Sequence, residues 1–310
     1  MILKGLGVGA CVVVSMILFK QNQMLYIPQV DPRKSRHNRS NPRMYRSPAE
    51  WSMPYEEAFI ETSDGLKVHG WFIKAGAQTK DTYTLLYFHG NAGNIGMRLP
   101  LLQQLREHAD YNILALDYRG YGDSDAGSGG PTEKGIKLDA RAAYDYLRER
   151  KDVANDRIII FGRSLGGAVA ISLAASLQEN EQAAGLIVEN TFTSIVDIAL
   201  VLMPFLRLLR PVIKPPILIN EWNSLGSIPR VQCPTLFISG LKDELIPPSH
   251  MKRLHEASSQ RSGVTTTFRT IADGTHNDTP IRGGAQYYSI ITEFVDQLQS
   301  EKDDGSCQSE

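Results

Sequence analysis

The stretch Gly162-Arg163-Ser164-Leu165-Gly166 decides the fold of this 310-residue chain. An isoleucine-rich run (157–161) precedes it, and a run of small residues (167–170) follows it. This context predicts a strand, a tight turn and a helix, with Ser164 at the tip of the turn. Glycine on either side of the serine leaves room where a Cβ would clash, so the hydroxyl is pushed beyond the sheet edge. The alternative is a glycine-rich turn between a strand and a helix that has no catalytic role.

Short apolar strands are expected on both sides of this turn. They cover residues 58–62, 66–72, 85–88, 113–116, 157–161, 186–188, 236–238 and 266–270, and helices are expected at 132–150, 165–179 and 248–258. The first two strands form a hairpin around Ser63-Asp64-Gly65. Apolar strands that alternate with helices predict an α/β fold, with a mostly parallel eight-stranded sheet and helices on both faces. We expect one such domain over residues 56–300.

A serine hydroxyl needs a base to accept its proton and an acid to orient that base. Among seven histidines, His276 is the one in a polar loop after the last strand, downstream of the serine. The acid should follow a strand between the two, where Asp243 and Glu244 stand side by side. Glu189, which ends the preceding strand, is the reserve candidate. The sequence thus predicts Ser164 as nucleophile, His276 as base and Asp243 as acid.

Acyl transfer at a serine also needs N–H donors for the oxyanion. One is the backbone N–H of Leu165, at the start of the helix that follows the serine. The second is expected in the glycine-rich loop after strand 85–88, where the N–H of Asn91 is our candidate. His89 and Asn94 are expected to brace that loop.

Several segments together resemble the α/β-hydrolase superfamily, and within it a membrane-anchored branch. The segments are His89-Gly-Asn, Asp117-Tyr-Arg-Gly-Tyr-Gly, Gly162-Arg-Ser-Leu-Gly-Gly, Asn190-Thr-Phe-Thr-Ser-Ile and Gly274-Thr-His-Asn. The resemblance covers residues 56 to 300, implies the α/β-hydrolase fold, and carries the family triad onto Ser164, Asp243 and His276. Related hydrolases place the acid in Asp-x-x-Ile/Val-Pro, which favours Asp243 over Glu244. The resemblance also implies a single-pass type II membrane protein.

The amino end differs in composition from the rest. Residues 1–20 are almost uncharged and close to the length that spans a bilayer, so we expect a transmembrane signal anchor rather than a cleaved signal peptide. Residues 21–55 are rich in proline and basic residues and predict an extended stalk. The basic residues after the span favour a cytosolic body, contrary to the type II topology. A sequon at Asn38 would be exposed in such a stalk, and a second at Asn277 lies beside the proposed base, where we expect no glycan.

One strongly apolar segment, 195–219, interrupts the alternation of strands and helices. Within residues 191–227 it predicts either a buried crossover helix or a lid whose apolar face holds an acyl chain or touches a bilayer. Residues 301–310 are expected to form a polar tail.

Composition and motif content exclude some classes of partner and cofactor. The net charge of −1 and the lack of a basic cluster argue against a nucleic-acid partner. No metal-binding motif is present, and neither a metal nor a cofactor is expected. We expect a membrane-anchored serine hydrolase that cleaves an ester or thioester of a lipid-like acyl group. The alternatives are a protein depalmitoylase and a non-catalytic scaffold with the same fold.

Overall fold

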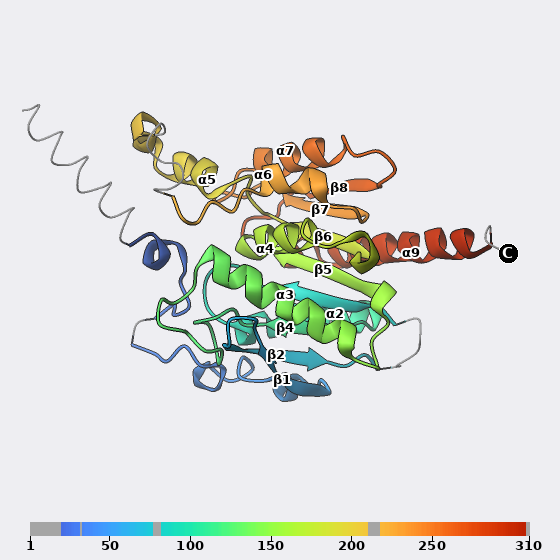
Figure 1. Cartoon of the computed structure of the whole chain (residues 1–310), viewed down its shortest axis with the longest axis horizontal. Helices are drawn as coiled ribbons and strands as arrows, with labels where there is room; N and C mark the ends of the chain where they lie inside the picture. The colour runs from blue at the N-terminus through green and yellow to red at the C-terminus, as the bar shows by residue number, and fades with distance from the viewer. Residues whose placement is uncertain (1–19, 32, 77–81, 210–217, 308–310) are drawn as a thin grey trace, which may run out of the picture.

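The computed structural model describes residues 20–31, 33–76, 82–209 and 218–307. An eight-stranded sheet lies at the centre, between helices on both faces (Figure 1). The strands are β1 (Tyr55–Glu61), β2 (Lys67–Ile73), β3 (Thr84–Phe88), β4 (Asn112–Leu116), β5 (Ile158–Arg163), β6 (Gly185–Glu189), β7 (Thr235–Gly240) and β8 (Thr266–Ile271). Their order across the sheet is β1-β2-β4-β3-β5-β6-β7-β8, and β2 runs opposite to the others. The predicted mostly parallel eight-stranded sheet is confirmed.

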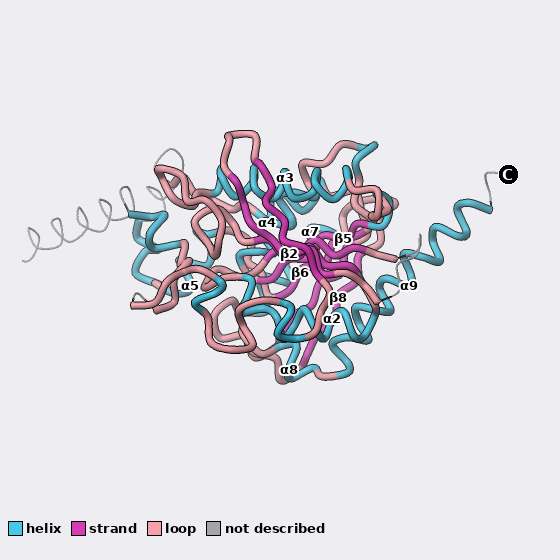
Figure 2. Tube along the Cα trace, turned by 90° about the horizontal axis from the view of Figure 1, so that it is seen from below, coloured by secondary structure: helices cyan, strands magenta, loops and turns pink. Residues whose placement is uncertain are grey.

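Helices cover the two faces of this sheet in two groups (Figure 2). The helices are α2 (Leu99–Ala109), α3 (Glu133–Glu149), α4 (Leu165–Ala174), α5 (Ile195–Leu202), α6 (Ser224–Ser227), α7 (Pro248–Ser258), α8 (Thr279–Gly283) and α9 (Ala285–Cys307). The core on one face packs α3, α4 and α7, and the core on the other packs α2 and α9. Alternate residues of each strand enter alternate cores: Leu86 and Phe88 enter one, and Leu85 and Tyr87 the other. Both faces are apolar, which explains the continuous apolar runs in the sequence.

Two helix ends differ from their predicted positions. Helix α4 ends at Ala174 rather than at residue 179, and the chain then turns so that Leu177 is buried. Helix α9 continues to Cys307, past the expected domain end at residue 300 and into the expected polar tail. An ion pair between Lys302 and Asp156 holds this extension against the body.

The expectation of an extended stalk over residues 21–55 is wrong for the part that the structure describes. Tyr26 is 3% exposed, and its hydroxyl bonds Asn220 and the Trp222 indole. One guanidinium nitrogen of Arg36 donates to carbonyls of the loop after β4, those of Tyr121, Gly122 and Ser124. Some of the polar and basic residues that suggested a solvated stalk, Arg36 among them, instead donate hydrogen bonds to loops of the domain.

The sequon at Asn38 is buried, contrary to expectation, with 2% of its surface exposed. Its amide nitrogen donates to Asp117 at 2.8 Å, and its amide oxygen accepts from the Gly96 N–H at 3.1 Å. A glycan on that nitrogen is incompatible with these contacts, so Asn38 offers no test of membrane orientation. Asn277, in the second sequon, is exposed.

The predicted anchor, residues 1–20, lies outside the described residues except for Lys20. Across the described parts of the chain, no helix combines the length and the apolar character needed to cross a bilayer. Residues 20–25 form a short helix, and Met24 within it is 49% exposed.

The apolar segment within 191–227 is not a buried crossover helix in its described part. Helix α5 projects from the body beside α6 (Figure 1). It packs with the turn Pro204–Leu209 through a small separate cluster of Leu200, Leu206 and Leu218. Large apolar side chains remain exposed on this segment, namely Val201, Leu202, Leu208 and Ile219. The segment is therefore an apolar projection with its own small core.

Candidate active site

Ser164 lies at the junction of β5, which ends at Arg163, and α4, which begins at Leu165. Its backbone has φ 54° and ψ −121°, a conformation that non-glycine residues rarely adopt. A Cβ on Gly162 would lie 2.0 Å from the Gly166 carbonyl oxygen. A Cβ on Gly166 would lie 2.0 Å from the carbonyl oxygen of Phe88 on β3. The turn can form only with glycine at both places, as the sequence predicted.

Three loops at the carboxyl ends of the strands bring Ser164, Asp243 and His276 together. His276 Nε2 is 3.0 Å from Ser164 Oγ, and His276 Nδ1 is 2.8 Å from Asp243 Oδ2. Asp243 follows β7 and His276 follows β8, so the three side chains come from separate parts of the chain. His276 and Asp243 are 5% and 6% exposed. The serine hydroxyl thus has an imidazole within reach, and a carboxylate fixes the far side of that imidazole.

The geometry also separates the candidate acids. The second oxygen of Asp243 accepts the backbone N–H groups of Leu245 and Ile246, which orients the carboxylate toward the histidine. Glu189 is fully buried, but it accepts the Tyr287 hydroxyl at 2.6 Å and pairs with Arg163. Glu244 reaches the backbone N–H of His276, at 3.4 Å, and not the ring. Of the three acids, Asp243 is therefore the one placed on the imidazole.

Asn190 connects the loops that carry Asp243 and His276, a role for which the sequence analysis made no prediction. Its side-chain oxygen accepts the N–H of Gly240 at 2.8 Å, at the end of β7. Its nitrogen donates to the carbonyl of Thr275 and to the hydroxyl of Thr279, on either side of His276. The signal that could have found it is its position directly after β6, at the same sheet edge as the other loops.

The loop after β3 lies against Ser164. A Cβ on Gly90 would stand 3.5 Å from the Cβ of Ser164, so Asn91 follows a residue in contact with the serine. His89 Nδ1 donates to the Gly90 carbonyl at 2.7 Å, and the ring stacks on Tyr118 with centroids 4.4 Å apart. Burial lowers the pKa of His89 to about 4, so the ring is neutral at pH 7. Opposite the loop, Leu165 is the first residue of α4, where backbone N–H groups have no partner within the helix.

Residues 25–41, which we call the N-terminal brace, hold this loop from outside. The Asn91 side chain accepts the Ile27 N–H at 3.2 Å and donates to the Leu25 carbonyl. Ile27 also pairs with Ala92 in a parallel bridge. Further along, the side chains of Asn41 and Asn94 bond each other. The predicted bracing role of Asn94 thus has a partner that the stalk interpretation did not foresee.

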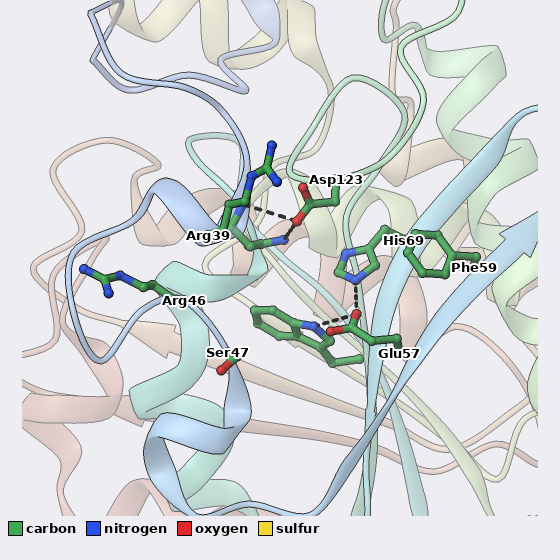
Figure 3. A pocket seen from close by; sticks show the side chains of 9 residues that line it. Arg39, Arg46, Ser47, Glu57, Phe59, His69 and Asp123 are labelled. Carbon is green, nitrogen blue, oxygen red and sulfur yellow. Dashed lines mark hydrogen bonds and ion pairs between the residues drawn. The ribbon is translucent and has the colours of Figure 1, made fainter.

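Asp117, at the end of β4, anchors the same loop from below. One oxygen accepts the Ile95 N–H at 2.9 Å, and the other accepts from Asn38. His69 lies beside it, bonded through Nε2 to Glu57 (Figure 3). Burial of His69 opposes protonation, but the charge of Asp117, whose Oδ2 is 3.7 Å from Nδ1, and the hydrogen bond to Glu57 outweigh it and raise the pKa of His69 to about 9. A charged histidine therefore underlies the carboxylate that holds the loop.

Chemically, this arrangement can activate a hydroxyl and stabilise an oxyanion. A neutral imidazole can take the serine proton, and a fixed carboxylate can stabilise the imidazolium that forms. Within the described ranges, no group of three histidine, cysteine or acidic side chains is placed to hold a metal ion.

Comparison with known proteins agrees with this geometry. The family model described as serine aminopeptidase, S33, matches residues 79–221. The alpha/beta hydrolase domain-containing protein WAV2 of Arabidopsis thaliana is 37% identical, over 96% of this chain and 94% of its own length. A Saccharomyces cerevisiae protein described only as a membrane protein is 34% identical, over 80% of this chain and 82% of its own length.

A solved structure supports the fold. The Pyrococcus furiosus esterase Pf2001 superimposes with a TM-score of 0.64 at 22% identity, over 81% of this chain and 95% of that one. At that identity the likeness establishes the fold alone, whereas the similarity to WAV2 extends along nearly the whole chain. The chain therefore belongs to the α/β-hydrolase superfamily.

Proposed function

We propose that this α/β-hydrolase is a serine hydrolase that cleaves a carboxylic ester or thioester of a lipid-like acyl group. The observation that carries the proposal is the unbroken line from Ser164 Oγ through the His276 ring to Asp243, with contacts of 3.0 and 2.8 Å. A histidine with only a structural role would not require a serine in a strained backbone conformation on one side. Nor would it require, on the other side, a carboxylate that is oriented by two backbone N–H groups.

The reaction follows from these positions. Ser164 Oγ attacks the acyl carbonyl carbon while its proton moves to His276 Nε2, and Asp243 stabilises the resulting imidazolium. The backbone N–H groups of Leu165 and Asn91 receive the oxyanion. When the bond from carbon to oxygen or sulfur breaks, His276 returns the proton to the leaving alcohol or thiol. A water molecule then repeats the sequence on the acyl-enzyme and releases the carboxylic acid.

The apolar projection supports a lipid-like acyl group. Leu202 and Leu208 are 51% and 88% exposed, and such exposed apolar surface favours contact with an apolar ligand or a bilayer. The returning limb of the projection contacts the start of the described chain, through Ile219 with Gln21 and Asn220 with Asn22. The chain therefore enters the body beside the exposed apolar side chains.

We further propose that residues 1–20 anchor the protein in a membrane and that the projection faces that membrane. The name of the yeast relative agrees with a membrane location. The family resemblance favours a type II orientation. In this arrangement an acyl chain could pass from the bilayer to the serine along the apolar projection.

Fluorophosphonate labelling of the full chain in detergent tests the proposal. We expect wild type to be labelled and Ser164→Ala to be unlabelled, because the probe reacts with an activated serine. Ser172→Ala is the matched control, since that serine is also on α4 but lies away from the elbow. Labelling that persists in Ser164→Ala, or a folded wild type that is never labelled, would reject the serine mechanism.

A substrate series then separates the two enzymatic readings. We expect turnover of long-chain esters and thioesters to exceed that of acetyl analogues, because the apolar projection contributes only to long chains. Preference for a palmitoylated peptide over a free palmitoyl ester would favour a depalmitoylase. Full cellular function in Ser164→Ala would favour the scaffold.

A further inference from the structure

A cavity of about 360 Å³ lies beside the loop that carries the proposed base, His276. Its walls come from the start of α2, the loop after β8, α8 and α9. The lining side chains used below are Arg98, Gln104, Arg163, Asn277, Ile281 and Tyr288. Arg163 directly precedes the nucleophile and Asn277 directly follows the base, so the cavity borders the catalytic loops.

The polar lining of this cavity favours an anion. Two arginines contribute positive charge, two amides and two tyrosine hydroxyls can donate hydrogen bonds, and no aspartate or glutamate is among the lining residues. Arg163 is the better satisfied of the two arginines. It donates to the His276 carbonyl at 2.5 Å and pairs with Glu189 at 3.3 Å.

Arg98 has no such partners. Its one hydrogen bond within the described part of the chain is from Nη2 to the Ala92 carbonyl. Its Nε is shielded from solvent and has no partner there. Burial and the neighbouring charge of Arg163 both lower the pKa of Arg98. Arg98 as a whole is half-buried, so its charge has lost part of its contact with water and has no carboxylate in exchange, and a bound anion would offset that loss.

The rim of the cavity is apolar. Ile281 is 80% exposed and Met97 is 42% exposed, and Pro100, Leu101 and Pro280 complete the wall between them. A ligand that fits both parts carries an anionic group inside and an apolar or neutral portion at the mouth. A phosphate monoester matches the interior better than a single carboxylate, because its three terminal oxygens can accept from Arg98, from the remaining N–H groups of Arg163, and from the amide and tyrosine donors.

We propose that this cavity binds the phosphate group of a phosphate monoester, either as a lipid headgroup or as a small free phosphate. For the lipid source, the inference deepens the proposed function and rests on it. The substrate would be an acyl ester of a phosphorylated alcohol, with its phosphate on Arg98 and Arg163 and its ester at Ser164. Hydrolysis would then release a fatty acid and the phosphorylated alcohol.

Binding can be measured separately from turnover. The full chain carrying Ser164→Ala, in neutral detergent micelles, is titrated by calorimetry with 1-palmitoyl-glycerol 3-phosphate, with neutral 1-palmitoylglycerol, and with inorganic phosphate. We expect the phosphorylated lipid to bind about tenfold or more tightly than the neutral lipid, the gain typical of a charge-assisted contact. Arg98→Gln should abolish that preference. Arg106→Gln, which removes one charge on α2 away from the cavity, should retain it.

Ile281→Glu provides a second test, since this exposed rim residue can change without loss of the fold, and a carboxylate there should weaken phosphate binding. Arg98-dependent binding of inorganic phosphate that equals or exceeds the lipid's would assign the site to free phosphate. Equal affinity for both lipids with no phosphate binding, or a preference that survives both Arg98→Gln and Ile281→Glu, would overturn the proposal. All affinities are measured in the Ser164→Ala protein, so they do not depend on the serine mechanism. If that mechanism is wrong, the fluorophosphonate labelling experiment will show it.

Discussion

The conformation of Ser164 is set by glycines two positions before and after it, whereas the loop that contains Asn91 is held by residues that lie 22 to 66 positions from their partners in the loop. At the elbow, Gly162 and Gly166 allow backbones to approach where no side chain fits. At the loop, the N-terminal brace and Asp117 provide a set of hydrogen bonds. Steric positioning at the elbow needs no partner that can leave or titrate. The loop depends on such partners, so the two regions should fail in different ways when they are disturbed.

The largest effect is expected from Gly166→Ala in the elbow. The new Cβ would meet the Phe88 carbonyl oxygen at 2.0 Å, and Phe88 is held in place by the pairing of β3 with β5. We expect the free energy of unfolding to fall by about 3 kcal/mol or more, with fluorophosphonate labelling lost. Chemical denaturation measures the first quantity.

Gly129→Ala is the control for this change, since nothing lies within 4 Å of a Cβ at that position. Its unfolding free energy should stay within about 0.5 kcal/mol of wild type. A Gly166→Ala protein of normal stability and labelling would show that the elbow is less constrained than its geometry indicates.

An intermediate effect is expected from Asn91→Ala in the loop. The substitution leaves the backbone N–H in the chain but removes the bonds to Leu25, Ile27 and Tyr121. We expect kcat for an ester to fall about tenfold, less than the 100-fold or more that loss of an oxyanion donor costs, with KM little changed. Steady-state kinetics measures both constants.

Asn155→Ala, an exposed asparagine at the opposite edge of the sheet, should leave kcat unchanged. If folded Asn91→Ala has the kcat of wild type, the N-terminal brace does not position the donor. If KM alone rises, the loop binds substrate rather than the transition state.

A third effect, on stability at high pH rather than on kcat, is expected from titration of His69 beneath the loop. Its pKa is about 9 in the folded protein, against about 6.5 in an unfolded chain. The charged form is therefore favoured by folding, so its contribution is complete below pH 6.5 and is lost as the pH rises through 9. We expect wild type to lose on the order of 2 kcal/mol of unfolding free energy across that window, relative to His69→Gln.

The groups that face His69 are Glu57, Asp117 and Asp123. Denaturation at pH 6, 7.5 and 9 measures the loss, and the exposed His108→Gln should retain the wild-type slope. Identical slopes in wild type and His69→Gln would show that the charge on this histidine does not support the loop.

The predictable parts of the molecule are those with a local cause. Buried strands are continuous apolar runs, and the elbow requires glycine at fixed spacing, so the sheet and Ser164 could be located from the sequence. The order of strand ends placed His276, and the structure sets it beside Asp243. Their catalytic roles remain predictions.

The parts that the sequence misjudged depend on contacts between distant segments. Proline and arginine in residues 21–55 have the composition of a solvated linker, and nothing local shows that Arg36 meets three carbonyls of another loop. The sequence around Asn190 and Asn38 does not show that their side chains connect separate loops, because their partners are distant in the chain. The charge on Arg98 likewise indicates an anion site only because no carboxylate is among the residues that line its cavity.

The bridge between Ile27 and Ala92 also bears on how this protein can be recombined. Deleting everything before residue 55, as a boundary drawn at β1 would suggest, removes the partners of Asn91, Asn94 and Asp117 together. A gene fusion that replaced the amino-terminal segment would also have to supply a matching brace. The part of the chain that must be transferred as one piece therefore begins before Tyr26, and a junction at residue 55 would separate the α/β-hydrolase body from its brace.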